Sequence, residues 1–170
     1  LGDVYKRQVV PPIHSDFSGG RERLDLRYET VKTVTDPEAP MRDILSQLLE
    51  HQESHRQAEL ESRQCLSGPH KDDLAVDLDG VSAKTYASQG QTRTAALSLK
   101  LGCREIFFHD TGEWPVLLLD DVLSELDHRR QEFVLNRIAG GQVFITCCED
   151  DRLEGLGEGS TFHIHNGRLV

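Results

Sequence analysis

Two consecutive aspartates are the residues in this sequence best suited to metal and acid–base chemistry. They are Asp120 and Asp121, and they end the continuous apolar run Val116–Leu119, which is typical of a buried parallel strand. Ligands bind beyond the carboxyl ends of strands in open parallel sheets. One carboxylate there can hold Mg²⁺ through its water shell, and the other can orient or deprotonate an attacking water. The alternative is that both acids only begin a loop and cap the next helix.

A second candidate is the stretch Ser88-Gln89-Gly90-Gln91, which precedes a predicted helix. The free N–H groups of a helix amino terminus, a serine hydroxyl and a glycine that permits close approach would together suit a γ-phosphate. The alternative needs no ligand, because Ser88 and Gln91 have the spacing of an S-x-x-Q capping box.

The order of these parts resembles the ABC-type ATPases, and the motifs resemble the RecF family in particular. The signature-like S-Q-G-Q comes first, the apolar strand with its two acids follows, and D-D-V-L-S-E-L-D then runs from Asp120 to Asp127. The stretch Gly68–Leu74, G-P-H-K-D-D-L, is similar to a G-P-H-R-D-D-L stretch of that family. The resemblance covers residues 66–170. Upstream, only the kinds of element are similar to the family, namely a strand and a polar helix.

The resemblance implies an ATP-dependent DNA-binding clamp of recombinational repair, with partners in the RecO and RecR families. In such a homodimer, one head holds the nucleotide and the signature motif of the other closes over the γ-phosphate. The family roles would fall on Ser88, Gln89, Gly90 and Gln91 (signature motif for ATP), Asp120 (Mg²⁺, through water), Asp121 (catalytic base), and Ser124 and Asp127 (D-loop facing the partner head).

Four departures from the family or ABC pattern qualify this implication. Asp121 stands where many such ATPases have Glu, which implies slow hydrolysis, and Cys147 occupies the position of a switch histidine. Lys71 replaces an Arg, which keeps the charge but loses the bidentate fork. The phosphate-binding pattern G-x-x-x-x-G-K-[ST] is absent, so we expect it in an amino-terminal half outside this sequence.

The expected architecture is α/β: the carboxy-terminal half of an ABC-type ATPase head, with parallel strands, flanking helices and a terminal hairpin, plus part of a helical second lobe. We expect a non-native leader at 1–8, a second-lobe remnant at 9–66 and the head part at 67–170. Periodicity and turn residues predict a loop (11–20), strands (23–31, 74–78, 81–86, 114–119, 143–146), helices (41–64, 92–101, 125–138) and a hairpin (161–170).

Composition narrows the class of protein. The 170 residues are 37% apolar and 28% charged, which suits one globular domain, and no apolar run is long enough for a membrane span. The four cysteines show no C-x-x-C spacing, so a reducing cytoplasm is the expected setting. A net charge of −10 argues against DNA binding by this chain alone; we expect it in the full-length dimer.

Two other functions remain open from the residues alone. Asp120, Asp121 and Asp127 could serve a stand-alone Mg²⁺-dependent phosphohydrolase, which would act without a P-loop. An acidic interaction module would instead bind a basic partner regardless of ATP and Mg²⁺. The pair His163 and His165 is expected to lie exposed on the terminal hairpin rather than to hold a metal.

Overall fold

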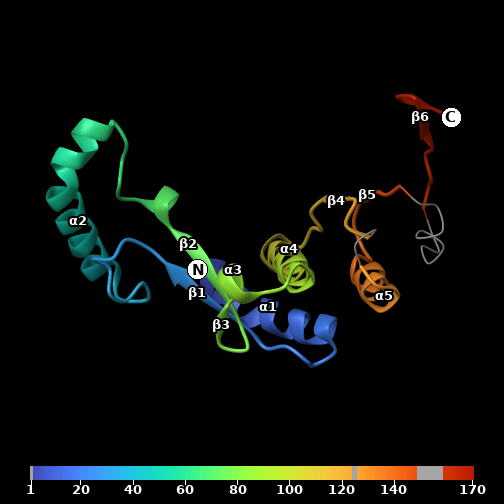
Figure 1. Cartoon of the computed structure of the whole chain (residues 1–170), viewed down its shortest axis with the longest axis horizontal. Coiled ribbons are helices and arrows are strands. Elements are labelled where there is room, and N and C mark those ends of the chain that lie inside the picture. Colours follow the sequence, from blue (N-terminus) through green and yellow to red (C-terminus); the bar gives the residue numbers. More distant parts are fainter. Residues whose placement is uncertain (1, 124–125, 149–158) are drawn as a thin grey trace. The chain divides into compact units, whose positions relative to one another are not determined.

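The computed structural model describes residues 2–123, 126–148 and 159–170, which fold as two compact units, Leu1–Gly102 and Cys103–Val170 (Figure 1). The predicted α/β class is confirmed. The helices are α1 (Gly2–Ser18), α2 (Met41–Ser62), the short η1 (Pro69–Lys71), α3 (Ala83–Tyr86), α4 (Gln89–Thr111) and α5 (His128–Arg137). The strands are β1 (Leu24–Glu29), β2 (Asp73–Leu78), β3 (Val81–Ser82), β4 (Leu117–Asp120), β5 (Val143–Thr146), β6 (Ile164–His165) and β7 (Arg168–Leu169). No helix in the described part of the chain is long and apolar enough to cross a membrane.

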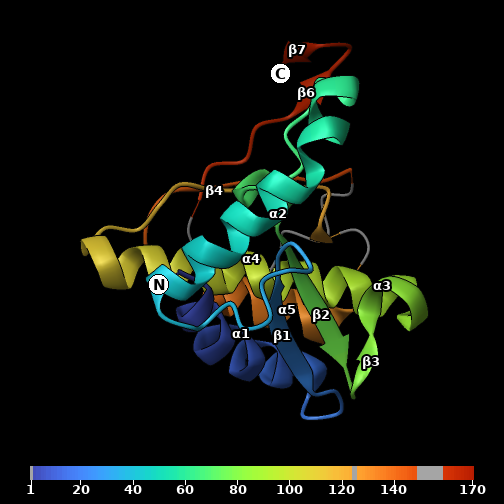
Figure 2. The same cartoon turned by 90° about the vertical axis from the view of Figure 1, so that its left-hand side faces the viewer.

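The first unit is built on an antiparallel sheet of order β1-β2-β3, which Figure 2 shows side by side. Alternation along β1 buries Leu24 and Leu26, and Leu24 lies opposite Leu78 of β2. These leucines form one core with Val10 of α1 and Ala95 of α4. The core therefore joins an early helix, two strands and the amino-terminal part of α4.

The predicted loop at 11–20 is wrong, because α1 runs through Pro11 and Pro12. Each proline lacks an N–H and would normally break a helix. Here the apolar positions Val10, Ile13 and Phe17 recur at helical spacing and are fully or almost fully buried, so packing outweighs local propensity. Residues 2–8 are the first turns of the same helix; their non-native origin remains a prediction, as does the division into lobes at residue 66.

The long polar helix predicted for 41–64 is confirmed as α2, which ends at Arg63 in a left-handed conformation (φ 55°). Apart from a buried His51 it is mostly exposed, as Met41 (84%) and Leu60 (67%) illustrate. His51 Nδ1 lies 2.6 Å from Ser67 Oγ, which ties the middle of the helix to the segment that follows it. Burial, assisted by nearby His55, lowers the pKa of His51 from its ordinary value, and Glu59 acts in the opposite direction.

Two predicted elements of the first unit differ in length. The second strand of the Asp79-Gly80 hairpin stops at Ser82, and Ala83–Tyr86 turns into α3 instead of extending the strand. The helix predicted for 92–101 is much longer, because α4 continues to Thr111. It stops where Gly112 adopts a left-handed φ of 74° and its N–H donates to the carbonyl of Phe108 at 2.8 Å.

The second unit contains the predicted parallel pair, β4 and β5, with Leu117 opposite Val143 and Asp120 opposite Thr146. The strand predicted from Trp114 begins only at Leu117. α5 connects the two strands, as expected for a β-α-β unit, but begins at His128, since Asp127 caps it, rather than at Glu125. The terminal hairpin β6–β7 is confirmed on Asn166-Gly167.

In the described part of the chain, one face of this parallel pair is exposed. Leu118 and Phe144 lie directly opposite each other and are 60% and 53% exposed, whereas Leu117 and Leu119 on the other face are buried. Parallel sheets are normally covered on both faces. The exposed face is therefore what we expect of strands taken from a larger sheet, in which other elements cover that face.

Arg104 of α4 organises the turn after α5. Its guanidinium is buried, lies 4.1 Å over the Trp114 ring and donates to the carbonyl oxygens of Arg137, Ile138 and Gly140. Burial lowers the pKa of Arg104, while Glu105 acts to raise it. A Cβ on Gly141 would come within 2.5 Å of the Cβ of Trp114, so the turn requires glycine.

Candidate functional site

The S-Q-G-Q stretch forms the exposed start of α4. Ser88 Oγ accepts a hydrogen bond from the backbone N–H of Gln91 at 3.3 Å, and Gln91 Oε1 accepts one from the N–H of Ser88 at 2.9 Å. The predicted capping box is thus confirmed in both directions. Gln89 and Gly90 occupy the first turn, whose N–H groups have no carbonyl within the helix to bond, so the end retains the character of an anion site.

Gln91 is also held from the side by residues that the sequence did not single out. Its Nε2 donates to Glu22 Oε1 at 3.0 Å, and the other oxygen of Glu22 lies 3.3 Å from Nε2 of His14. His14 is completely buried, and its Nδ1 lies 3.2 Å from Ser98 Oγ. In the sequence, His14 and Glu22 stand on either side of the Gly19-Gly20 pair, and this was the signal that could have identified them. We instead predicted a loop over residues 11–20.

The acid pair in the second unit lies at the carboxyl ends of β4 and β5, where parallel strands present ligand sites. Thr146, the last residue of β5, donates from its hydroxyl to Asp120 Oδ1 at 2.5 Å. The backbone N–H of Asp121 bonds Thr146 through its hydroxyl (3.0 Å) and its carbonyl (3.1 Å). Thr146, another residue missed from the sequence, therefore holds both acids.

Asp121 has a left-handed backbone with φ of 49°. Aspartate and asparagine tolerate this conformation better than most residues with a side chain, and such residues are concentrated at functional sites. The side chain of Asp121 is exposed at the end of the strand pair. The alternative was that the two acids begin a loop and cap the next helix. A loop does begin there, since Asp120 ends β4 and Asp121 follows it, but the capping part is wrong for α5, because Asp127 is its cap.

Asp127 accepts a hydrogen bond from the N–H of Arg130 at 2.9 Å, and its other oxygen lies 3.7 Å from Nε of the same residue. Its side chain is nonetheless 61% exposed, so it stays accessible to a partner. Ser124, the other predicted D-loop residue, lies outside the described residues. Cys147 directly follows Thr146 and is partly buried at the position expected for a switch histidine.

The carboxylate of Asp120 suits Mg²⁺, which proteins usually bind through one or two carboxylates while the ion keeps several waters. One oxygen of Asp120 is occupied by Thr146, which leaves the other oxygen of an exposed carboxylate for the water shell of the ion. Among the described residues no group of three or more His, Cys, Asp or Glu side chains converges on a metal position. Such an ion would therefore also need oxygen ligands from bound phosphates, as Mg²⁺ commonly has.

Three residues of the Gly68–Leu74 stretch, Gly68, Pro69 and Asp72, line a separate cavity of about 400 Å³ in the first unit. Asp72 there accepts a hydrogen bond from the hydroxyl of Tyr28, and His70 Nε2 lies 2.9 Å from the carbonyl oxygen of Cys65. Lys71, the substituted position, is exposed. The stretch follows α2 in the chain and ends in the first two residues of β2.

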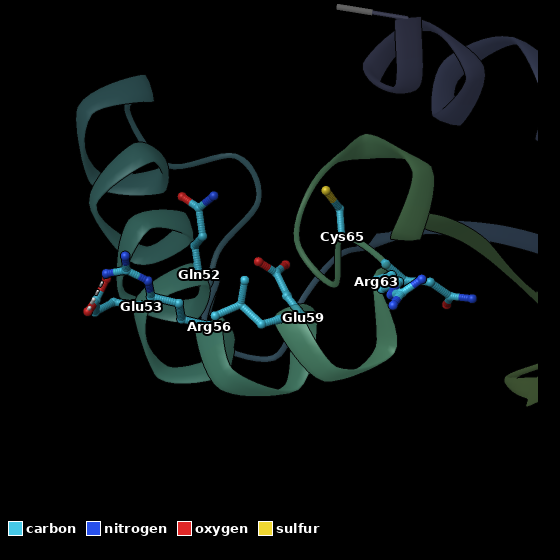
Figure 3. Close-up of a pocket in the computed structure, with 8 residues that line it drawn as sticks. Gln52, Glu53, Arg56, Glu59, Arg63 and Cys65 are labelled. Atoms are coloured by element: carbon cyan, nitrogen blue, oxygen red, sulfur yellow. Dashed lines mark ion pairs between the residues drawn. The ribbon is translucent and has the colours of Figure 1, made fainter.

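A further hollow of about 430 Å³ follows the carboxy-terminal half of α2 (Figure 3). Charges of both signs line it, with Glu53 and Arg56 paired at 3.9 Å, and Glu59 accepts a hydrogen bond from the N–H of Leu66 at 2.6 Å. Its lining residues are Gln52, Glu53, Arg56, Glu59, Leu60, Arg63, Gln64 and Cys65. The mixed charges favour no single class of ligand.

Comparison with family models gives no match, but curated relatives match almost the whole chain. It is 43% identical over 162 residues to the DNA replication and repair protein RecF of Bacillus subtilis, covering 94% of this chain and 44% of that protein. The RecF of Acetivibrio thermocellus is 39% identical over 157 residues, covering 92% and 42%. The chain thus spans less than half the length of these relatives.

Solved structures agree with the sequence comparison. A structure of the recombination mediator protein RecF with ATP, described as belonging to the RecFOR pathway, has a TM-score of 0.76 and 32% identity over 98% of this chain and 43% of that one. The same protein described as RecF-ATPrS has a TM-score of 0.74 and the same identity and coverage. By sequence and by fold, this chain belongs to the RecF family and corresponds to its carboxy-terminal half.

Proposed function

We propose that this chain forms part of an ATP-dependent DNA-binding clamp that acts in the cytoplasm in recombinational DNA repair and replication-gap processing. Its share of the ATP site is the signature motif, the Walker B acids and the D-loop, and the site is completed across a homodimer. Members of the RecO and RecR families are the partners. The relatives' names and the ATP-bound relative support the assignment.

The observation that carries the proposal is the exposed start of α4. The Ser88–Gln91 box fixes the first turn by engaging the N–H groups of Ser88 and Gln91, while Ser88, Gln89 and Gly90 remain exposed at the helix end. A helix amino terminus of this kind binds phosphate oxygens through N–H groups and the helix dipole. The motif is therefore suited to a γ-phosphate held by the P-loop of the opposite subunit.

In this proposal the acids act on the nucleotide that their own subunit holds. Asp120, oriented by Thr146, supports Mg²⁺, which would neutralise charge developing on the phosphates. Asp121 accepts a proton from the attacking water, and Asp127 contacts the partner head. Aspartate is one methylene shorter than the usual glutamate, so hydrolysis is slow. That rate suits a clamp that must stay closed on DNA.

Sedimentation with ATP tests the proposal in a full-length protein that joins this chain to the amino-terminal half of its relatives. Ser88→Arg puts a bulky side chain into the proposed seam, so ATP binding should persist while ATP-dependent dimerisation is lost. Asp121→Asn should dimerise and then persist as a dimer, with hydrolysis slowed by about 10²- to 10⁴-fold, as is typical of general-base loss. Asparagine also tolerates the left-handed φ at this position.

The matched control is Ser62→Arg, the same change at an exposed serine at the end of α2. It should dimerise like wild type. If Ser88→Arg also dimerises normally and loses only about 1 kcal/mol of stability, the motif is a helix cap and nothing more. Phosphate release by the 170-residue chain alone would instead favour the stand-alone phosphohydrolase.

A further inference from the structure

The buried histidine of α1 has chemistry that the proposed function leaves unused. His14 is fully buried, and it is connected by side chains to the signature motif more than 70 residues later. The connection runs from Ser98 through His14 and Glu22 to Gln91. Its last member forms the capping box with Ser88, so the chain of contacts ends on a proposed ATP-contacting hydroxyl.

Both ends of the Gln91 amide are engaged. Its oxygen accepts from the N–H of Ser88, and its nitrogen donates to Glu22, so the side chain cannot rotate without losing one of these bonds. An ordinary capping box fixes only its own turn. Here the second bond anchors the box to a residue outside the helix.

Glu22 is itself held in position. It follows the Gly19-Gly20 turn, in which both glycines are left-handed and the N–H of Gly20 donates to the carbonyl of Ser15 at 2.7 Å. The N–H of Glu22 also donates to Ser18 Oγ at 3.3 Å. Its carboxylate is only 16% exposed, and a partly buried acid in this position needs a partner.

That partner is His14, whose Nε2 lies 3.3 Å from an oxygen of the Glu22 carboxylate. The Ser98 hydroxyl lies 2.8 Å from the carbonyl of Thr94, which can only accept, so its proton is committed there and His14 Nδ1 must donate to Ser98. The contact between Nε2 and the Glu22 carboxylate is buried but is not aligned as a hydrogen bond.

We propose that Glu22 and His14 are positioning residues that set the geometry of the signature motif through Gln91. The proposal rests on the function proposed above for Ser88. Packing of α1 against α4 would then determine whether the motif can close over a phosphate. The role requires no contact between either residue and the nucleotide.

The first measurement uses the 170-residue chain and does not depend on ATP. The NMR order parameter of the Gln91 side-chain amide should be high in wild type and fall in Glu22→Ala to the level of Gln89, an exposed glutamine of the same turn. Glu22→Gln retains an acceptor for Gln91 and should restore much of the order. Glu29→Ala removes an exposed acid from β1 and should change nothing. An unchanged Gln91 in Glu22→Ala would overturn the proposal.

The second measurement uses the full-length protein. Glu22→Ala and His14→Gln should weaken ATP-dependent dimerisation by about 10-fold, the effect expected from losing one hydrogen bond, while ATP affinity stays at the wild-type value. Glu22→Gln should recover part of the dimerisation, which a general loss of packing would not allow. If Glu22→Ala lowers ATP affinity and dimerisation equally, the residues are structural only. If wild type does not dimerise with ATP, the proposed function fails, whereas the Gln91 result still decides whether the network orders the motif.

Discussion

The signature motif and the acid pair are held in different ways. Ser88 and Gln91 are fixed by side chains that reach a fully buried histidine, so their geometry depends on the packing of α1. Asp120 and Asp121 are fixed by the pairing of two short strands and by one threonine at the end of the second strand. The first arrangement depends on residues far apart in sequence, and the second on strand register.

The signature motif and the acid pair should therefore respond to different mutations. Core substitutions in the first unit should be transmitted to the motif because the network passes through the core. The acids should respond mainly to changes at Thr146 or to loss of the β4–β5 pairing. Four expected outcomes probe the two units separately, from the largest effect to the smallest.

The largest effect is expected from Arg104→Met. The substitution removes a buried guanidinium and leaves the carbonyl groups of Arg137, Ile138 and Gly140 without their donor, so the second unit should lose about 3 kcal/mol of stability. Hydrogen exchange should rise in β4 and β5 and stay unchanged in β1 and β2. Lys100→Met, at an exposed cation on the same helix, is the control. Equal loss in both sheets would contradict two separable units.

Thr146→Val should affect the acids without unfolding the strand, because valine has the same shape and a high preference for strands. Loss of the hydroxyl frees Asp120 and removes one acceptor of the Asp121 N–H, so hydrolysis by the full-length protein should fall about 10- to 100-fold. Thr146→Ser keeps the hydroxyl and should remain near wild type. A fully active valine variant would show that backbone pairing alone holds the acids.

Gly102→Ala tests the joint between α1 and α4. An added Cβ would lie 2.5 Å from a methyl group of Val10, so the helices must shift, and the stability of the first unit should fall by about 1.5 kcal/mol. Urea unfolding measures the loss. In the double variant with Val10→Ala the two effects should be less than additive, because the alanine relieves the clash. Strict additivity would mean that the helices do not meet as described.

The smallest effect is a pH dependence confined to α2. The pKa of His51 is lowered by folding from its ordinary value of 6.5, so the unfolded chain binds the proton more readily. The stability contributed by this group is complete above pH 6.5 and is lost as pH falls through 6.5 toward the lower folded value. Hydrogen exchange in α2 should therefore accelerate on acidification, and His51→Gln should abolish the change. An undiminished response in that variant would assign the pH dependence to another group.

Much of the second unit could be predicted from the sequence, because its signals are local. The apolar run before Asp120, the glycines after α5 and the Asn166-Gly167 turn predicted elements that the structure confirms, with shifted ends. The roles of Ser88, Asp120, Asp121 and Asp127 remain predictions, although the capping box is confirmed.

The rest depended on contacts between distant residues. Pro11 and Pro12 are strong local signals for a loop, and only burial of the neighbouring apolar side chains overrides them. With α1 unrecognised, His14 and Glu22 could not be related to Gln91. Thr146 was missed because a threonine at a strand end becomes informative only when the parallel partner strand is known.

The exposed face of the parallel pair determines how the chain should behave as a laboratory reagent. Leu118 and Phe144 form an uncovered apolar surface beside strand edges that can accept another strand. A net charge of −10 opposes self-association by repulsion, but salt screens that repulsion while leaving the apolar surface unaffected. The 170-residue chain should therefore be most soluble in dilute buffer and should precipitate as ionic strength rises. The NMR measurement should therefore be made on protein purified and kept at low ionic strength.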